Sequence, residues 1–172
     1  MIKRLGLFAG ASALKVALPR RFRRLAEASV QICRQAERDH LRRCAEALGA
    51  RPALARAVVA HRGFHAADGS LALPLENTLD AYETAWAAGV SLCECDVGLT
   101  SDGVLVLCHD TNFRRLALGD EGGDTDALAR APLINLSLRD VKRLRLASGA
   151  SAPTLEAVLV AARELSPAHG GA

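Results

Sequence analysis

The sequence lacks the features that mark several classes of protein. Its 172 residues contain no uncharged apolar run near the roughly 20 residues that a membrane-spanning helix needs. Six prolines and 14 glycines are too few for a collagen-like or linker-like chain. The five cysteines are scattered and odd in number, so we interpret them as reduced thiols in an intracellular compartment. Half of the residues are hydrophobic, which excludes a wholly disordered chain.

Acidic residues are absent from the first 26 positions, and charge divides the chain in two. Residues 1–56 carry 13 basic and four acidic side chains, a net charge of +9, whereas residues 57–172 have a net charge of −6. A helical stripe over about 24–48 follows the most basic segment. We therefore predict a basic helical arm over residues 1–55 and a separate domain over 56–172.

Three interpretations of the basic arm are open. Its Arg-rich, acid-poor start fits an organelle transit peptide or a weak signal sequence, and it also fits a helix lying on an anionic membrane. The third interpretation is a solvated helix that belongs to the fold. The arm lacks interleaved aromatic residues and any finger or turn-helix signature, so we expect no nucleic-acid binding. The expected location is cytoplasmic or organellar.

Strand and helix patterns alternate in the second part of the chain. Apolar runs predict strands over 57–60, 90–99 and 104–108, and helical patterns cover about 77–88, 137–146 and 154–165, with a long loop over 111–135. Asn77 with Asp80, and Ser137 with Asp140, fit helix N-caps. This alternation predicts a parallel α/β fold. The turn at Asp102-Gly103 suits either a hairpin or a short connection between parallel strands.

Two acidic and two histidine side chains lie at the predicted strand ends, where such a fold places its functional residues. Glu94 and Asp96 share one face of a strand, where a hard cation such as Mg²⁺ or Ca²⁺ would offset the cost of two adjacent carboxylates. Solvation, or pairing with arginine, would also offset the cost of two adjacent carboxylates. His61 and His109 each follow an apolar strand, so all four residues are expected at one rim. Two histidines beside a phosphate can act as acid and base, and Arg62 can hold a phosphate oxygen.

Ordered motifs then point to a known family. They run Ala60-His61-Arg62-Gly63, Pro74-Leu75-Glu76-Asn77-Thr78, Glu94-Cys95-Asp96-Val97, Thr100-Ser101-Asp102-Gly103-Val104, His109-Asp110 and Ala152-Pro153-Thr154-Leu155-Glu156. This order resembles the first part of the glycerophosphodiester phosphodiesterase family, over residues 57 to about 165. The family folds as a (β/α)8 barrel and hydrolyses glycerophosphodiesters to an alcohol and glycerol phosphate in lipid metabolism.

The resemblance implies a role for each matching residue. His61 and His109 would be the catalytic acid/base pair, Glu94 and Asp96 the metal ligands for Mg²⁺ or Ca²⁺, and Arg62 a phosphate contact. Glu76 and Asn77 would have a supporting role, although Leu75 is an extra residue in their motif.

The family also supplies a third metal carboxylate and a lysine from a later E-x-K strand, which the printed sequence does not contain. A complete barrel takes at least ~200 residues, so we expect an incomplete (β/α)8 TIM barrel with about three parallel strands. The alternatives are a non-catalytic fragment or degenerate barrel, tethered to a membrane or organelle by its arm, and a sphingomyelinase D-like phospholipase, which shares a similar opening motif.

Overall fold

The computed structural model describes residues 39–40, 42–65, 74–118 and 123–165. Residues 42–49 are helical, which agrees with the end of the helix predicted over 24–48. The rest of that helix and residues 1–38, on which the transit-peptide and membrane predictions depend, lie outside the described ranges. Among the described helices, none has the length and apolar character needed to cross a bilayer.

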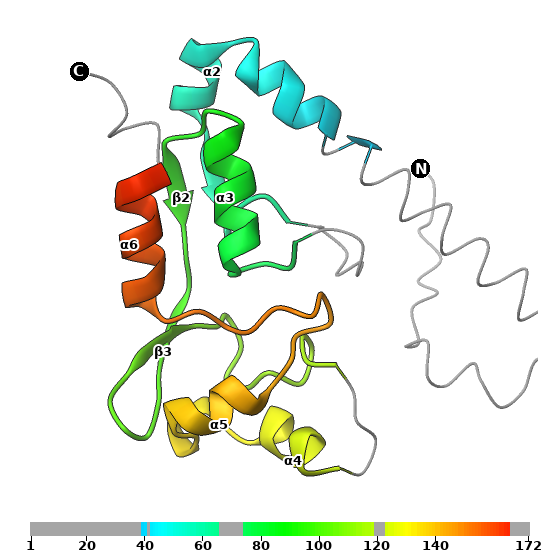
Figure 1. The fold of residues 1–172 in the computed structure, drawn as a ribbon, viewed down its shortest axis with the longest axis vertical. Coiled ribbons are helices and arrows are strands. Elements are labelled where there is room, and N and C mark those ends of the chain that lie inside the picture. The colour runs from blue at the N-terminus through cyan, green and yellow to red at the C-terminus, as the bar shows by residue number, and fades with distance from the viewer. Residues whose placement is uncertain (1–38, 41, 66–73, 119–122, 166–172) are drawn as a thin grey trace, which may run out of the picture.

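An α/β unit forms one end of the molecule. Strands β1 (Val59–His61) and β2 (Leu92–Glu94) pair in parallel, with Val59 opposite Leu92 and His61 opposite Glu94. Helices α3 (Leu79–Ala87) and α6 (Leu155–Leu165) lie side by side and pack together (Figure 1). Helix α2 (Pro52–Ala57) precedes β1, and its first residue is a proline, which has no N–H to leave unpaired.

The two faces of this parallel pair differ. Ala60 and Cys93 face the helix layer, where Ala60 packs with the buried residues Ala85 and Val90. A second cluster between α3 and α6 contains Tyr82, Trp86, Leu107 and Val158. On the opposite face, Val59 and Leu92 are 58% and 56% exposed. His61 and Glu94 share this open face because they are two residues further along their strands.

A second unit is built on an antiparallel hairpin. Strand β3 (Val97–Leu99) pairs with β4 (Leu105–Leu107), and Gly103 takes a positive φ of 79° in the turn. Helices α4 (Asp124–Arg130) and α5 (Leu138–Arg143) and a 3-10 turn, η2 (Leu133–Asn135), complete this end of the molecule (Figure 1). Its core contains Val106, Phe113, Leu133, Val141 and Leu144. The prediction of about three parallel strands is therefore wrong for the described residues, in which two are parallel.

The structure differs from the sequence predictions in three further places. The strand predicted over 90–99 is divided into β2 and β3, because pairing with β1 ends at Glu94 and pairing with β4 begins at Val97. Thr78, not Asn77, is the N-cap of α3, and its side chain accepts a hydrogen bond from the Ala81 N–H. The segment predicted as a loop contains α4, in which Arg130 and Asp126 pair one turn apart at 2.9 Å.

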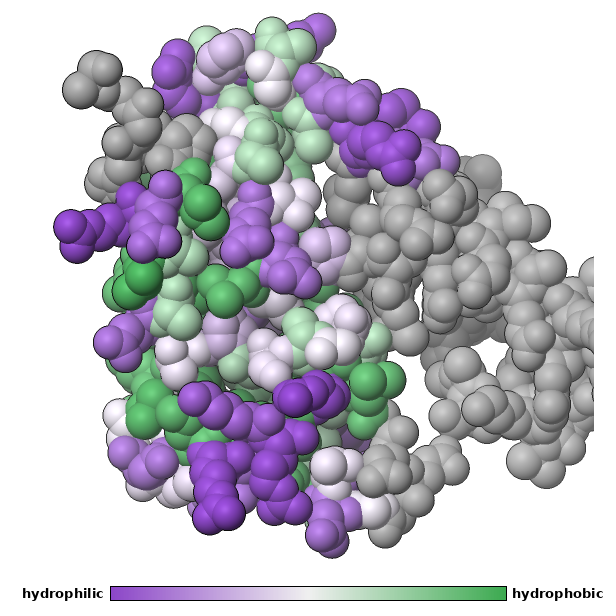
Figure 2. All heavy atoms as spheres, in the orientation of Figure 1, coloured by the Kyte–Doolittle hydropathy of each residue, from purple (hydrophilic) through white to green (hydrophobic). Residues whose placement is uncertain are grey.

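Two predicted helix starts are confirmed. Ser137 and Asp140 form the predicted capping box of α5, and Thr154 precedes α6 and accepts a hydrogen bond from Ala157. Gly89 ends α3 with a φ of 84°. Hydrophilic side chains gather over α5 at the lower end of the face seen in Figure 2.

Candidate active site

The two parallel strands end in a histidine and a glutamate that face each other. His61 is the last residue of β1 and Glu94 the last of β2, and their Nε2 and Oε2 atoms lie 3.9 Å apart. The His61 side chain is 66% exposed, so an external molecule can reach it. The sequence prediction that these residues share one rim is met by the strand register.

Arg62 connects the acidic residues of this rim. Its N–H lies 3.2 Å from a carboxylate oxygen of Glu94, and its Nη1 donates to Glu76 at 3.2 Å. Its Nε lies 2.8 Å from Asp96 Oδ2, as an ion pair without hydrogen-bond geometry. Arg62 has a left-handed φ of 56°, so the chain turns sharply after β1. The Arg62 side chain thereby contacts Glu76 and Asp96 at the end of the strands.

Asn77 holds the second acidic residue in place. Its Nδ2 donates to Asp96 Oδ2 at 3.0 Å, and its Oδ1 accepts hydrogen bonds from the Asp96 N–H at 3.2 Å and the Tyr82 hydroxyl at 2.8 Å. Asn77 is 2% exposed and has a φ of 57°. These partners explain why Asn77 is buried at the site instead of capping the helix.

A chain of ion pairs links this rim to the second histidine. Glu76 binds Arg62 and also accepts two hydrogen bonds from Arg115, at 2.9 and 2.6 Å. Arg115 Nε donates to Asp110 at 2.8 Å, and Asp110 lies 2.7 Å from Nδ1 of His109. His109 is thus connected to Arg62 through three side chains.

The electrostatics of these acids follow from their partners. Burial raises the pKa of Glu76, but the hydrogen bond and charge of Arg115 and the charge of Arg62 lower it by more, so the net pKa lies below its usual value. The hydrogen bond from Arg115 lowers the pKa of Asp110 against the opposing effect of partial burial, and His109 lowers it further. Both carboxylates are therefore ionised at neutral pH.

A backbone hydrogen bond joins the segment that carries His109 to the segment that carries Asp96. The Cys108 N–H donates to the Asp96 carbonyl at 3.1 Å, directly beyond the β3–β4 pairing. The Cys108 thiol is buried, and burial raises its pKa to about 11. Cys93 and Cys95 are partly buried and pack against the cluster of Tyr82, Trp86, Leu107 and Val158.

The extra residue of the motif, Leu75, anchors the loop that carries Glu76 and Asn77. Leu75 is 2% exposed within the core of the hairpin unit, and its carbonyl accepts a hydrogen bond from Thr78 at 2.7 Å.

Two residues of the site were missed by sequence reasoning. Asp110 directly follows the predicted catalytic residue His109, and this adjacency is the sequence signal that could identify it. Arg115 has no local signature, because its partner Glu76 is 39 positions away.

The donor chemistry fits a hard cation in part. Glu94 and Asp96 both offer carboxylate oxygens, which Mg²⁺ and Ca²⁺ prefer. Asp96 is already paired with the Arg62 guanidinium, whereas Glu94 accepts a hydrogen bond from the Arg62 backbone N–H and lies 3.9 Å from His61. Within the described ranges, no group of three or more His, Cys, Asp or Glu side chains is arranged to hold a metal ion.

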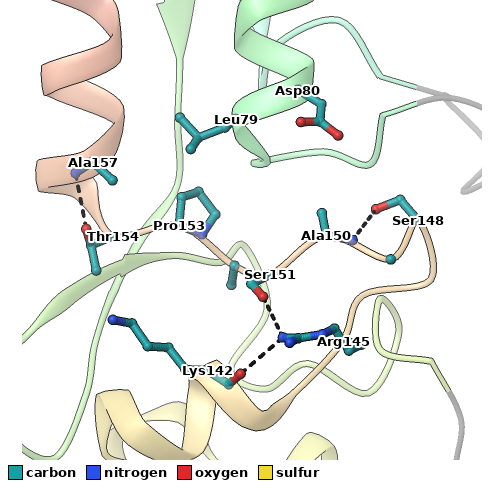
Figure 3. A pocket seen from close by; sticks show the side chains of 12 residues that line it. Leu79, Asp80, Lys142, Arg145, Ser148, Ala150, Ser151, Pro153, Thr154 and Ala157 are labelled. Atoms are coloured by element: carbon teal, nitrogen blue, oxygen red, sulfur yellow. Dashed lines mark hydrogen bonds between the residues drawn. The ribbon is translucent and has the colours of Figure 1, made fainter.

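A separate cleft of about 860 Å³ lies between the N-terminal ends of α3 and α6 and the segment after α5 (Figure 3). Lys142 and Arg145 project into it from one side, and Leu79 and Asp80 lie on the other. Arg145 is held by Ser151 Oγ at 2.8 Å and by the Lys142 carbonyl at 3.2 Å. The histidines do not line this cleft.

Comparison with known proteins gives one family. The model of the glycerophosphoryl diester phosphodiesterase family matches residues 61–166. The chain is 42% identical over 106 residues to probable glycerophosphodiester phosphodiesterase 2 of Mycobacterium tuberculosis, covering 62% of this chain and 34% of that protein. It is 49% identical over 41 residues to a lysophospholipase D of Mus musculus, covering 24% of this chain and 12% of that protein. The chain thus spans about a third or less of these relatives.

Among solved structures, a glycerophosphodiester phosphodiesterase from Agrobacterium tumefaciens aligns with a TM-score of 0.49 at 27% identity, over 63% of this chain and 43% of that one. One from Parabacteroides distasonis aligns with a TM-score of 0.46 at 30% identity, over 62% of this chain and 37% of that one.

Proposed function

The chain belongs to the glycerophosphoryl diester phosphodiesterase family, and from this premise we propose that its site hydrolyses the phosphodiester bond of glycerophosphodiesters. The products would be an alcohol and glycerol phosphate. The observation that carries the proposal is the pairing of His61 with Glu94 at the strand ends, with Arg62 contacting Glu94, Asp96 and Glu76. These contacts support the proposal, because they bring the His61 imidazole, two carboxylates and the Arg62 guanidinium to one rim.

Each side chain has a distinct task in this proposal. Arg62 orients the phosphate, because its guanidinium has five N–H donors and can contact a phosphate as well as Glu76 and Asp96. His61 and His109 form the acid/base pair: one accepts the proton of the attacking water, and the other donates a proton to the departing alkoxide. Asn77 and Glu76 support the site by holding Asp96 and Arg62.

Glu94 and Asp96 would hold a divalent cation, Mg²⁺ or Ca²⁺. Such a cation supplies Lewis-acid polarisation of a phosphoryl oxygen when bound. The support is the chemistry of the two carboxylates, whose oxygen atoms are the ligands that hard cations prefer.

The fold proposal is that the α/β unit forms the beginning of a (β/α)8 barrel. The open face of β1 and β2 supports it, since Val59 and Leu92 are apolar and exposed where barrel strands would turn their side chains inward. In such barrels the functional side chains gather at the carboxyl ends of the strands, where His61 and Glu94 lie.

The test is turnover by the purified 172-residue protein. Glycerophosphocholine and lysophosphatidylcholine are supplied separately, with Mg²⁺, with Ca²⁺ or with a chelator, and the released glycerol phosphate or lysophosphatidic acid and choline are measured. We expect cation-dependent release that H61A and H109A each lower by at least about 100-fold, as loss of an acid or base does. H40A is the matched control, because His40 lies in the helical segment that precedes α2 and contacts Cys44. Absence of turnover from folded protein would contradict the proposal.

The basic arm has a separable test. Residues 1–30 fused to a fluorescent reporter should leave the cytosol if the arm is a targeting or membrane-binding segment. A diffuse reporter would favour the third interpretation, a helix belonging to the fold.

A further inference from the structure

Arg115 joins two acidic residues that come from separate segments of the chain. Its Nη1 and Nη2 donate to the two carboxylate oxygens of Glu76, and its Nε donates to Asp110. Glu76 belongs to the loop before α3, whereas Asp110 follows β4. One planar guanidinium thus uses both of its edges to fix the separation and orientation of two carboxylates.

Burial distinguishes this cluster from an ordinary surface ion pair. The side chain of Glu76 is only 10% exposed, although that of Arg115 is 45% exposed. Exposed ion pairs contribute little because water and salt screen them. A buried carboxylate instead needs its partners, and removing Arg115 would take away two of the hydrogen bonds that Glu76 accepts.

The contact between Asp110 and His109 decides which ring nitrogen carries the proton. An ionised carboxylate can only accept a hydrogen bond, and Asp110 Oδ1 lies 2.7 Å from His109 Nδ1. The Nδ1 atom of neutral His109 must then carry the hydrogen, which leaves Nε2 as the basic nitrogen. The His109 side chain is 43% exposed, so its remaining edge is accessible from outside.

We propose that Arg115 is a positioning residue: by clamping Asp110 to Glu76, it holds His109 in the Nδ1–H tautomer and ties it to Arg62. The inference rests on the proposed function only in regarding His109 and Arg62 as the working groups. Lysine could not replace Arg115, because one ammonium cannot bind both oxygens of Glu76 in parallel while also donating to Asp110.

The experiment measures the His109 tautomer directly, independently of turnover. Protein labelled with ¹⁵N-histidine is examined by long-range ¹H–¹⁵N NMR at a pH where histidine is neutral, and the His109 signals are assigned by their loss in H109Q. In the unmodified chain we expect the Nδ1–H tautomer to exceed the other by about tenfold, the effect of one hydrogen bond to a charged group. R115Q and R115K should each bring the ratio to within about threefold of unity.

R114Q is the matched control, because the neighbouring Arg114 is exposed and contacts Asn112 through its backbone N–H. It should leave the tautomer ratio unchanged. If R115Q fails to fold because Glu76 is left buried with less charge compensation, the double variant E76Q/R115Q removes both charges and is measured instead. The inference is overturned if His109 keeps its Nδ1–H tautomer in R115Q, R115K or the double variant. Because no substrate is present, this result stands whether or not the chain turns over glycerophosphocholine.

Discussion

Replacing Gly63 with alanine tests the local geometry on which the position of Arg62 depends. Gly63 has a φ of 80°, and a Cβ at this position would lie 2.7 Å from the Ala81 carbonyl carbon and 2.8 Å from both its Cβ and its oxygen. The contact is close because the next residue, Phe64, donates its N–H to the Ala81 carbonyl at 2.8 Å. The loop after β1 is therefore pressed against the first turn of α3.

Two separate costs add in this variant. An L-residue in the left-handed region costs about 1–2 kcal/mol, and forcing a methyl group into a packed site costs about 1–3 kcal/mol. The obstructing atoms belong mainly to helix backbone, so the site cannot relax by rotating a side chain. We expect Gly63→Ala to lower the free energy of unfolding by about 3–4 kcal/mol.

Gly103→Ala isolates the first cost. Gly103 has nearly the same φ, 79°, but nothing lies within 4 Å of its hypothetical Cβ. It should cost about 1–2 kcal/mol. Urea denaturation of both variants, followed by circular dichroism, gives the difference, which we expect to be about 2 kcal/mol. Equal losses of stability in the two variants would refute the close approach of Gly63 to α3.

Three further predictions concern other contacts. Tyr82→Phe removes the buried hydrogen bond to Asn77 and should cost about 1 kcal/mol in thermal unfolding; no change would mean that water replaces it. Ser137→Ala removes the capping box of α5 and should also cost about 1 kcal/mol, with Ser137→Thr largely retaining stability. Glu76 and Asp110 have lowered pKa values, so they stabilise the fold above the unfolded carboxyl pKa of about 4 and lose this contribution as the pH falls through their lower folded values. Urea midpoints should therefore fall on acidification, and less steeply in E76Q or D110N; parallel pH profiles would contradict this.

The rim could be predicted from sequence because it follows from backbone rules. Carboxyl ends of parallel strands meet at one edge, so a histidine after one strand and an acidic pair in the next had to be neighbours. The observed pairing of His61 with Glu94 confirms that argument. The helix starts at Ser137 and Thr154 were equally readable, because the capping chemistry is local.

Features set by distant residues could not be predicted in this way. Asn77 has a good intrinsic capping propensity, but contacts with Asp96 and Tyr82 draw it into the site and leave Thr78 as the cap. The Asp102-Gly103 turn is compatible with either topology, and only the pairing of β3 with β4 selects the hairpin. The sequence around Arg115 does not distinguish it from other arginines, because its partner Glu76 is 39 positions away.

The central claim is that His61, Arg62, Glu94 and His109 act together at one phosphate-binding rim. The most direct measurement is an NMR titration of the ¹⁵N-labelled chain with glycerol 3-phosphate in the presence of Mg²⁺. We predict that the largest backbone amide shifts occur together at these four residues and saturate with one dissociation constant. Shifts confined to the cleft around Lys142 and Arg145, or no saturable shifts at the strand ends, would contradict the account.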